Sequence, residues 1–139
     1  MNNIQQKILK KLKIELADKF DKNFSQGGFF GNRWKPKKDG SASHLIGKGS
    51  GVLRRSIKSY IEGDSIVFTS STPYAAAHNE GVNKRVSVRS KKGKTFTRKM
   101  NLPQRQFIGE YDGMVKTVER IATQVLDNEM KKFVAKHNQ

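Results

Sequence analysis

The segment from Ile4 to Phe24 reads IQQKILKKLKIELADKFDKNF, and it decides the fold of this chain. Apolar side chains recur there at every fourth position: Ile4, Ile8, Leu12, Leu16, Phe20 and Phe24. Because an α-helix has about 3.6 residues per turn, this spacing predicts an amphipathic helix over residues 3 to 25. Gly27 and Gly28 follow and supply a C-terminal stop, since glycine accepts positive φ.

The apolar stripe of this helix is expected to wind around it. A strict four-residue repeat advances about 40° per step on a helix with 3.6 residues per turn. The two ends of the stripe therefore face different neighbours. We expect one end to be covered by a neighbouring subunit.

A second long helix is predicted from Asp112 to about Lys136. Its apolar side chains recur at spacings of three and four: Met114, Val115, Val118, Ile121, Ala122, Val125, Leu126 and Phe133. Charged residues occupy the other positions, as in a helix that covers a core with one face. The two helices are expected to pack against a small antiparallel sheet.

Two hairpins are predicted between the helices. Residues 56–62 alternate apolar and polar side chains, and residues 66–69 continue after a Gly-Asp-Ser turn, although 53–57 is also compatible with one helical turn. Residues 85–89 and 95–98 flank a turn at Gly93 with few apolar side chains. The fold class is therefore α+β: a small antiparallel sheet packed against long N- and C-terminal helices, with an extended basic β-hairpin arm. We expect one domain over residues 1–139, with the arm inserted at 82–101.

The charge of the chain points to an acidic partner. Its 139 residues include 28 Lys and Arg against 12 Asp and Glu, a net charge of +16. Such an imbalance favours binding to nucleic acid, an anionic membrane surface or a negatively charged protein. There is no cysteine, and no apolar run approaches the ~20 residues that span a bilayer. We expect synthesis in the cytoplasm and no membrane partner.

The basic arm is the clearest candidate contact surface. From Val82 to Gly109 there are nine Lys or Arg and no Asp or Glu. The candidate partner or oligomer contacts are Arg85, Arg89, Lys91, Lys92, Lys94, Phe96 and Arg98. Two interpretations remain open from the residues alone: the arm docks on an acidic protein surface, or it binds nucleic acid without sequence preference. No helix-turn-helix, zinc finger or pair of stacking aromatics favours a specific nucleic-acid module.

Catalysis has little support in the sequence. The three histidines, His44, His78 and His137, are scattered, so we expect no metal site. No Gly-x-Ser-x-Gly elbow is present, and the glycines of residues 47–51 lack the strand and helix of a phosphate-binding loop. A nuclease or peptidoglycan hydrolase would need a carboxylate pair or a metal cluster. We therefore predict a protein that is not an enzyme and has no cofactor.

Four motifs occur in an informative order. Trp34 lies in a Gly- and Lys-rich loop, residues 50–57 read SGVLRRSI, residues 74–81 read YAAAHNEG and residues 102–109 read LPQRQFIG. Together they resemble the phage virion morphogenesis proteins, the tail-completion proteins of tailed phages and Mu-like prophages. The matching positions are Trp34, Gly51, Leu53, Tyr74, His78, Gly81, Pro103, Arg105 and Phe107.

The resemblance implies a structural subunit at the head-proximal end of a phage tail. Such a protein completes the tail or joins tail to head, and related connector proteins form rings, so self-association is expected. Its partners would be copies of itself and other tail or connector proteins, with non-specific DNA contact possible. Its place would be the host bacterial cytoplasm during assembly and then the virion.

The motif residues are expected to serve the fold and subunit contact. Tyr74, His78 and Gly81 would hold a compact turn, with His78 fixing it as a polar residue and Gly81 supplying an unusual backbone angle. Pro103 would stiffen the approach to the last helix. Arg105 is placed to bind a carboxylate or a cluster of carbonyls. We expect Phe107 and Tyr74 to pack in the core.

Overall fold

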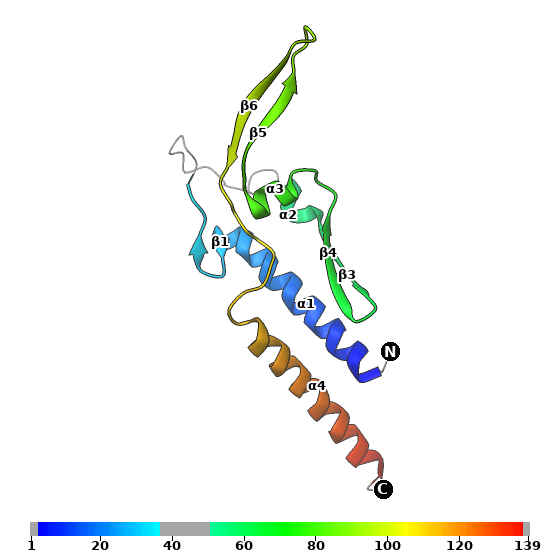
Figure 1. Cartoon of the computed structure of the whole chain (residues 1–139). Helices are drawn as coiled ribbons and strands as arrows, with labels where there is room; N and C mark the ends of the chain where they lie inside the picture. The colour runs from blue at the N-terminus through cyan, green and yellow to red at the C-terminus, as the bar shows by residue number, and fades with distance from the viewer. Residues whose placement is uncertain (1–2, 37–50, 138–139) are drawn as a thin grey trace.

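Two long helices and three hairpins make up the chain in the computed structural model, which describes residues 3–36 and 51–137 (Figure 1). The expected α+β class is confirmed. In order, the elements are α1 (Asn3–Gln26), β1 (Gly28–Phe29), β2 (Asn32–Arg33), α2 (Val52–Ser56), β3 (Ile57–Glu62), β4 (Ser65–Ser70), α3 (Ala75–Glu80), β5 (Val82–Arg89), β6 (Thr95–Leu102) and α4 (Met114–His137).

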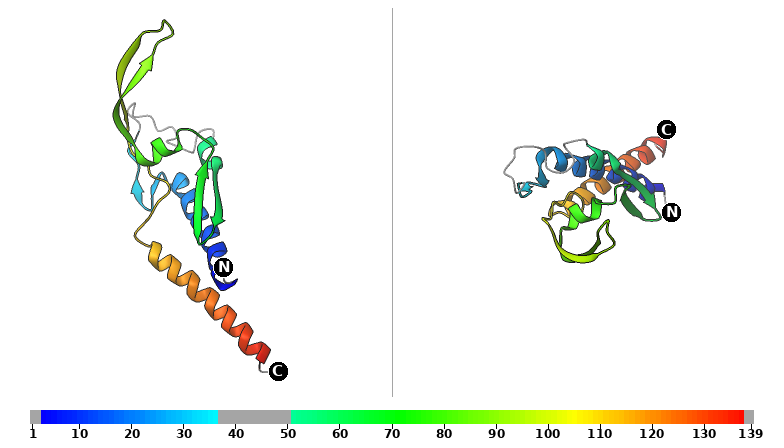
Figure 2. Two further views of the ribbon diagram at one scale, coloured as in Figure 1. Left: turned by 45° about the vertical axis from the view of Figure 1, so that its right-hand side comes forward. Right: turned by 90° about the horizontal axis from the view of Figure 1, so that it is seen from above.

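Helices α1 and α4 lie side by side and run in opposite directions (Figures 1 and 2). Ion pairs join Lys7 to Glu129 and Glu15 to Arg120. Residues nearer the N-terminus of α1 therefore lie beside residues nearer the C-terminus of α4. Asn3, the first residue of α1, therefore lies near the level of Lys132, and the last turn of α4 extends past the end of α1.

The main core lies between these helices and the β3–β4 hairpin. Leu12, Leu16 and Phe20 of α1 are buried against Ile121 and Val125 of α4. The ring of Phe20 meets the ring of Phe68 edge-on, with centroids 5.1 Å apart. Full burial of each such side chain stabilises the fold by about 1.5–3 kcal/mol.

The apolar stripe of α1 winds as expected, but its far end meets the same chain. Phe24 leaves the main core and joins a second cluster with Trp34, Leu53 and Phe107. Every stripe residue from Leu12 to Phe24 is buried by residues of its own chain. From Leu12 onward the stripe is covered by its own chain, because the loop after α1 and the segment before α4 fold back over it, and the subunit contact expected for one end of the stripe stays a prediction.

The strands form three separate two-stranded antiparallel sheets among the described residues: the two predicted hairpins, β3–β4 and β5–β6, and the short pair β1–β2, which the sequence did not predict. β3 pairs with β4 from Ile57↔Ser70 to Glu62↔Ser65 around Gly63, whose φ is +61°. The short helix α2 precedes β3 directly, so the helical turn and the hairpin considered as alternatives are both present.

The β5–β6 hairpin is the arm, and it projects away from the helices (Figures 1 and 2). Its ladder runs from Val82↔Leu102 to Arg89↔Thr95, which makes both strands longer than the sequence indicated. The strands extend further because residues 82–84 and 99–102 continue the antiparallel backbone pairing. None of the helices in the described ranges is long and apolar enough to cross a membrane.

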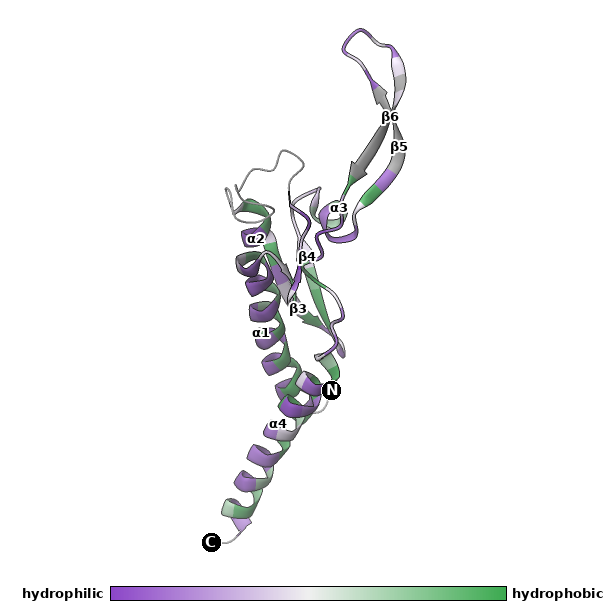
Figure 3. Cartoon of the chain, turned by 90° about the vertical axis from the view of Figure 1, so that its left-hand side faces the viewer, coloured by the Kyte–Doolittle hydropathy of each residue, from purple (hydrophilic) through white to green (hydrophobic). Residues whose placement is uncertain are grey.

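Helix α4 buries much less of its apolar surface than its sequence predicted. Its buried residues are Thr117, Ile121 and Val125. Leu126 and Phe133, which the periodicity assigned to the core, are 50% and 58% exposed. Figure 3 shows apolar residues recurring along α4 to its C-terminal end. The periodicity identified the helix, but only one side of the apolar band has α1 to pack against.

Candidate interaction surfaces

The residues of the four motifs meet where the arm joins the body, a region that we call the arm base. Trp34, Leu53 and Phe107 are buried there around Phe24. The centroid of the Phe24 ring lies 4.9 Å from that of Phe107 and 6.0 Å from that of Trp34. The indole nitrogen of Trp34 donates a hydrogen bond of 2.8 Å to the carbonyl of Gln106. Segments far apart in sequence are thus fastened at one place.

Asn79 holds the arm base together, although sequence reasoning did not single it out. Its side-chain oxygen accepts hydrogen bonds from the backbone N–H groups of Phe107 (2.9 Å) and Ile108 (3.1 Å). Its carbonyl accepts a third, from the side chain of Gln104. Short amides bond readily to nearby backbone, but the backbone groups that Asn79 binds are distant in sequence, so no local signal marked this residue.

Arg105 donates hydrogen bonds to backbone carbonyls, which were one of the two kinds of partner expected for it. It is 7% exposed, and its Nε and Nη2 donate to the carbonyl of Lys35 at 3.2 and 3.1 Å. Its own backbone N–H donates to the carbonyl of His78 at 2.8 Å. Arg105 therefore joins the segment after Trp34 to helix α3.

His78 and Tyr74 differ from expectation. The Nδ1 atom of His78 is buried without a hydrogen-bond partner, so the ring does not fix the turn through that atom; the carbonyl of His78 and the side chain of Asn79 make the connecting bonds. Tyr74 is 42% exposed, because it precedes α3 at the surface, and its ring packs edge-on against His78. Its predicted place in the core was wrong. Burial, and then the charge of Arg105, lower the pKa of His78.

Two substitutions of Arg105 distinguish the effect of its charge from that of its hydrogen bonds. We expect Arg105→Met to lower the free energy of unfolding by about 1.5–3 kcal/mol, because charged hydrogen bonds to Lys35 are lost. The pKa of His78 should rise part of the way to its ordinary value of 6.5, since burial remains. Arg105→Lys keeps the charge and should leave that pKa lowered. NMR titration of the His78 ring and chemical denaturation measure both effects, and an unchanged His78 pKa in Arg105→Met would contradict this account.

The lowered pKa of His78 also gives a pH dependence. The folded-state pKa lies below the unfolded value of 6.5, so the folded protein binds this proton less readily. The contribution of neutral His78 to stability is complete above about pH 6.5 and is lost as the pH falls through the folded-state pKa.

Gly81 lets the arm leave the body at a sharp angle. Its φ is +78° and its ψ is 163°, a combination that only glycine adopts readily. A Cβ atom at this position would lie 3.0 Å from the backbone nitrogen of Gln104. Both the backbone angle and the space beside it therefore require glycine, as the motif implied.

We expect Gly81→Ala to destabilise the fold more than the same change at Gly63. Both glycines have positive φ, but a Cβ at Gly63 would meet nothing within 4 Å. Gly63→Ala should cost about 1–2 kcal/mol from backbone strain, and Gly81→Ala roughly 3 kcal/mol or more because crowding is added. Chemical denaturation of both variants measures the difference. Equal losses would mean that the close approach to Gln104 is unimportant.

The tip of the arm presents positive charge to solvent. Arg89, Lys91, Lys92 and Lys94 are exposed. Arg85, Phe96 and Arg98 lie on β5 and β6, and their side chains are outside the described part of the structure. Of the other motif positions, Gly51 has a φ of +72° directly before α2, and Pro103 is half-buried directly after β6.

Several carboxylates of the body are already paired within the chain. Besides the pairs that join α1 to α4, Asp18 pairs with Lys22 at 2.9 Å, and Asp21 receives two bonds of 2.7 Å from Arg54. The hydrogen bonds from Arg54 hold the pKa of Asp21 below its usual range. These acids are poor docking points for the arm of another copy, because their charge is balanced locally.

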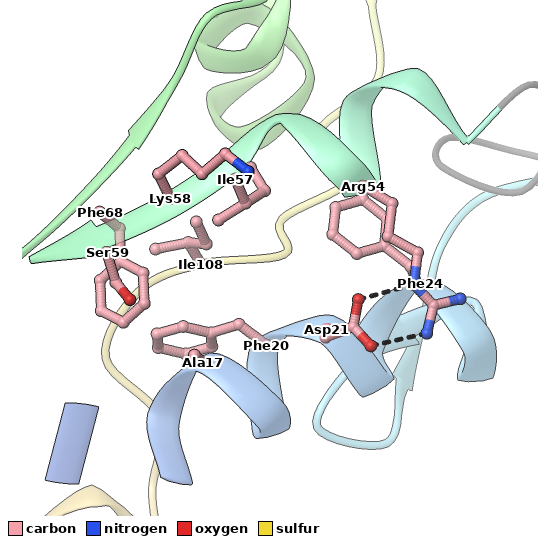
Figure 4. A pocket seen from close by; sticks show the side chains of 10 residues that line it. All are labelled: Ala17, Phe20, Asp21, Phe24, Arg54, Ile57, Lys58, Ser59, Phe68 and Ile108. Atoms are coloured by element: carbon pink, nitrogen blue, oxygen red, sulfur yellow. Dashed lines mark hydrogen bonds and ion pairs between the residues drawn. The ribbon is translucent and has the colours of Figure 1, made fainter. Parts of the chain in front are cut away.

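A small apolar cavity lies beside the Asp21–Arg54 pair, between α1 and the β3–β4 hairpin (Figure 4). Its volume is about 80 Å³, and Phe20, Phe68 and Ile108 line it. No histidine or glutamate borders it, and Asp21, the carboxylate that does, is paired with Arg54. Within residues 3–36 and 51–137, no three His, Asp or Glu side chains gather as metal ligands. The four residues 47–50 and His44 lie outside those ranges.

Comparison with known proteins agrees with the motifs. The phage virion morphogenesis family matches residues 2–127, which is most of the chain. The chain therefore belongs to this family of structural phage proteins. Searches of curated proteins and of solved structures gave no match.

Proposed function

We propose that this chain completes a phage or prophage tail, or joins tail to head, as a subunit of a ring and without covalent chemistry. Family membership supports a role in the particle. The observation that carries the finer proposal is the basic hairpin, which projects from a body whose helical carboxylates are largely paired internally (Figure 1). The protein would act in the host cytoplasm during assembly and remain in the virion at the head-proximal end of the tail.

The arm base gives the arm a fixed direction. Gly81 sets its exit angle, and Asn79 and Arg105 fasten the returning strand to α3 and to the segment after Trp34. A rigid base lowers the entropy lost when the arm binds. The exposed cations at the tip would then meet an acidic surface on a neighbouring tail or connector protein.

Neutralising the tip tests this function. We expect the triple variant Lys91→Gln, Lys92→Gln and Lys94→Gln to fold normally but to leave phage heads and tails unjoined, when it replaces the chain in the phage that encodes it. The control removes equal charge from exposed body positions with Lys10→Gln, Lys11→Gln and Lys58→Gln. Electron microscopy of lysates counts joined particles. Normal joining by the arm variant would refute the proposed role of the arm.

The exposed cations at the tip also favour a second candidate, non-specific binding to nucleic acid. Such binding weakens steeply with salt, with a slope of about 0.9 per phosphate contact on a logarithmic scale. Affinity for duplex DNA that persists near physiological salt, with a slope that falls by about 3 in the arm variant, would favour this function. Binding lost at physiological salt would favour a protein partner.

A further inference from the structure

Helix α4 carries an apolar strip near its C-terminal end that the described residues of the chain leave largely exposed. We call Leu126, Met130, Phe133 and Val134 the α4 face. Their exposed fractions are 50%, 62%, 58% and 46%. Successive spacings of four and three place Leu126, Met130 and Phe133 along one line on the helix, as in a two-helix seam. Ile121 and Val125, which pack in the core with α1, lie on another side of the helix.

Part of the face lines a groove rather than a flat surface. Leu126, Met130 and Phe133, with Ile4 of α1, border a groove of about 500 Å³. Since α1 begins near the level of Lys132, the last turn of α4 has no helix beside it in the described structure. A helix end this exposed gains little from packing within its own chain, and helical turns without packing are marginal in water.

The size of the α4 face suits a modest interface. The four side chains leave an apolar patch on the order of 400 Å² open on one copy, which is typical of functional patches on soluble proteins. Pairing two such faces, with their charged borders, reaches the lower end of the range for specific interfaces.

The positive charge of the chain limits the ways in which two copies can pair. The chain carries a net charge of +16, so most contacts between two copies are repulsive. The tip of the arm and the end of α4 lie at opposite ends of the elongated molecule, so pairing at α4 keeps the two arms far apart (Figures 1 and 2). Along the border of the face, Asp127 precedes Lys131 by one turn, and both are exposed. An antiparallel second helix would set each against its opposite charge.

We propose that the α4 face binds the α4 face of a second copy of this chain, with the two helices antiparallel around a two-fold axis. Leu126 of one copy would lie opposite Phe133 of the other, and Asp127 would lie close to Lys131 of the second copy. Leu126 and Phe133 of each copy then close the groove that Ile4 borders.

This contact goes beyond the proposed function. Met130, Phe133 and Val134 lie past residue 127, where the match to the family ends. A two-fold contact closes with two copies, so a ring needs another surface besides α4. If a ring is built from such pairs, the number of copies in it is even.

Solution measurements on the whole chain test the pairing. We expect light scattering and sedimentation to show a dimer that dissociates on dilution. Phe133→Ser should weaken it at least tenfold, whereas Val115→Ser, at a 67% exposed position nearer the start of α4, should not. Because the two copies repel, added salt should strengthen the dimer, the opposite of its effect on nucleic-acid binding.

The orientation is tested by crosslinking, since the chain has no cysteine. Under oxidation, a mixture of the variants Asp127→Cys and Lys131→Cys should form mixed disulfide dimers faster than either variant alone. Crosslinks that favour identical positions would overturn the antiparallel arrangement. A monomer at all concentrations would leave the α4 face to another protein and overturn the inference. Neither measurement involves phage assembly, so this inference and the proposed function can fail separately.

Discussion

Changing Asn23 to Asp should destabilise this protein by on the order of 3–5 kcal/mol, because it places a charge where the amide is fully enclosed. Asn23 is 1% exposed. Its Nδ2 donates to the carbonyl of Phe107 at 3.0 Å, and its Oδ1 accepts from the N–H of Phe30 at 3.1 Å. The side chain of Asn23→Asp keeps the acceptor, but a carboxylate oxygen then faces the carbonyl of Phe107. Two acceptors face each other without a proton between them.

The loss at Asn23→Asp should depend on pH. Burial and the facing carbonyl favour the neutral acid, which can donate to Phe107, so the folded-state pKa lies above the ordinary value of about 3.9. The stability of the variant is therefore closest to that of the parent protein below about pH 3.9, and it falls as the pH rises through the folded-state pKa. Denaturation at several pH values measures this. The control, Asn128→Asp on the exposed side of α4, makes the same chemical change and should alter stability by less than about 0.5 kcal/mol. Equal losses would show that burial of Asn23 is unimportant.

The long helices were predictable because each is a local pattern. The repeat from Ile4 to Phe24 gave α1 almost to the residue, and the spacing after Asp112 gave α4. What covers each helix depends on contacts between distant segments, which periodicity does not report. The stripe of α1 and that of α4 look alike in sequence. One is covered by the chain itself, and the other is half open at its C-terminal end.

The arm base shows a similar division. Gly81, Arg105 and Phe107 could be singled out because glycine, arginine and an aromatic ring in short motifs have few structural roles. Asn23 and Asn79 could not, because asparagine is common on surfaces and nothing local marks it as enclosed. Their importance follows from the backbone groups of Phe30, Phe107 and Ile108 that come near them only in the fold.

Phe107 and Phe133 allow one chemical change to be compared in two environments that the sequence did not distinguish. Phe107 is 2% exposed and packs on Phe24, whereas Phe133 is 58% exposed. We expect Phe107→Ala to lower the free energy of unfolding by about 3–5 kcal/mol, from lost burial and the cavity left behind. At a concentration where the chain is monomeric, Phe133→Ala should lower it by less than about 0.5 kcal/mol.

The dependence of stability on protein concentration should also differ between variants of Phe107 and of Phe133. Binding of a second copy stabilises the folded state in proportion to the logarithm of the free concentration above the dissociation constant. Phe107→Leu leaves a smaller cavity than Phe107→Ala. The parent protein and Phe107→Leu should therefore both become more stable as the protein concentration rises. Phe133→Ala should lose that dependence while keeping its stability at high dilution. Denaturation at two concentrations a hundredfold apart measures both effects, and a concentration dependence that survives in Phe133→Ala would place the contact between copies away from the α4 face.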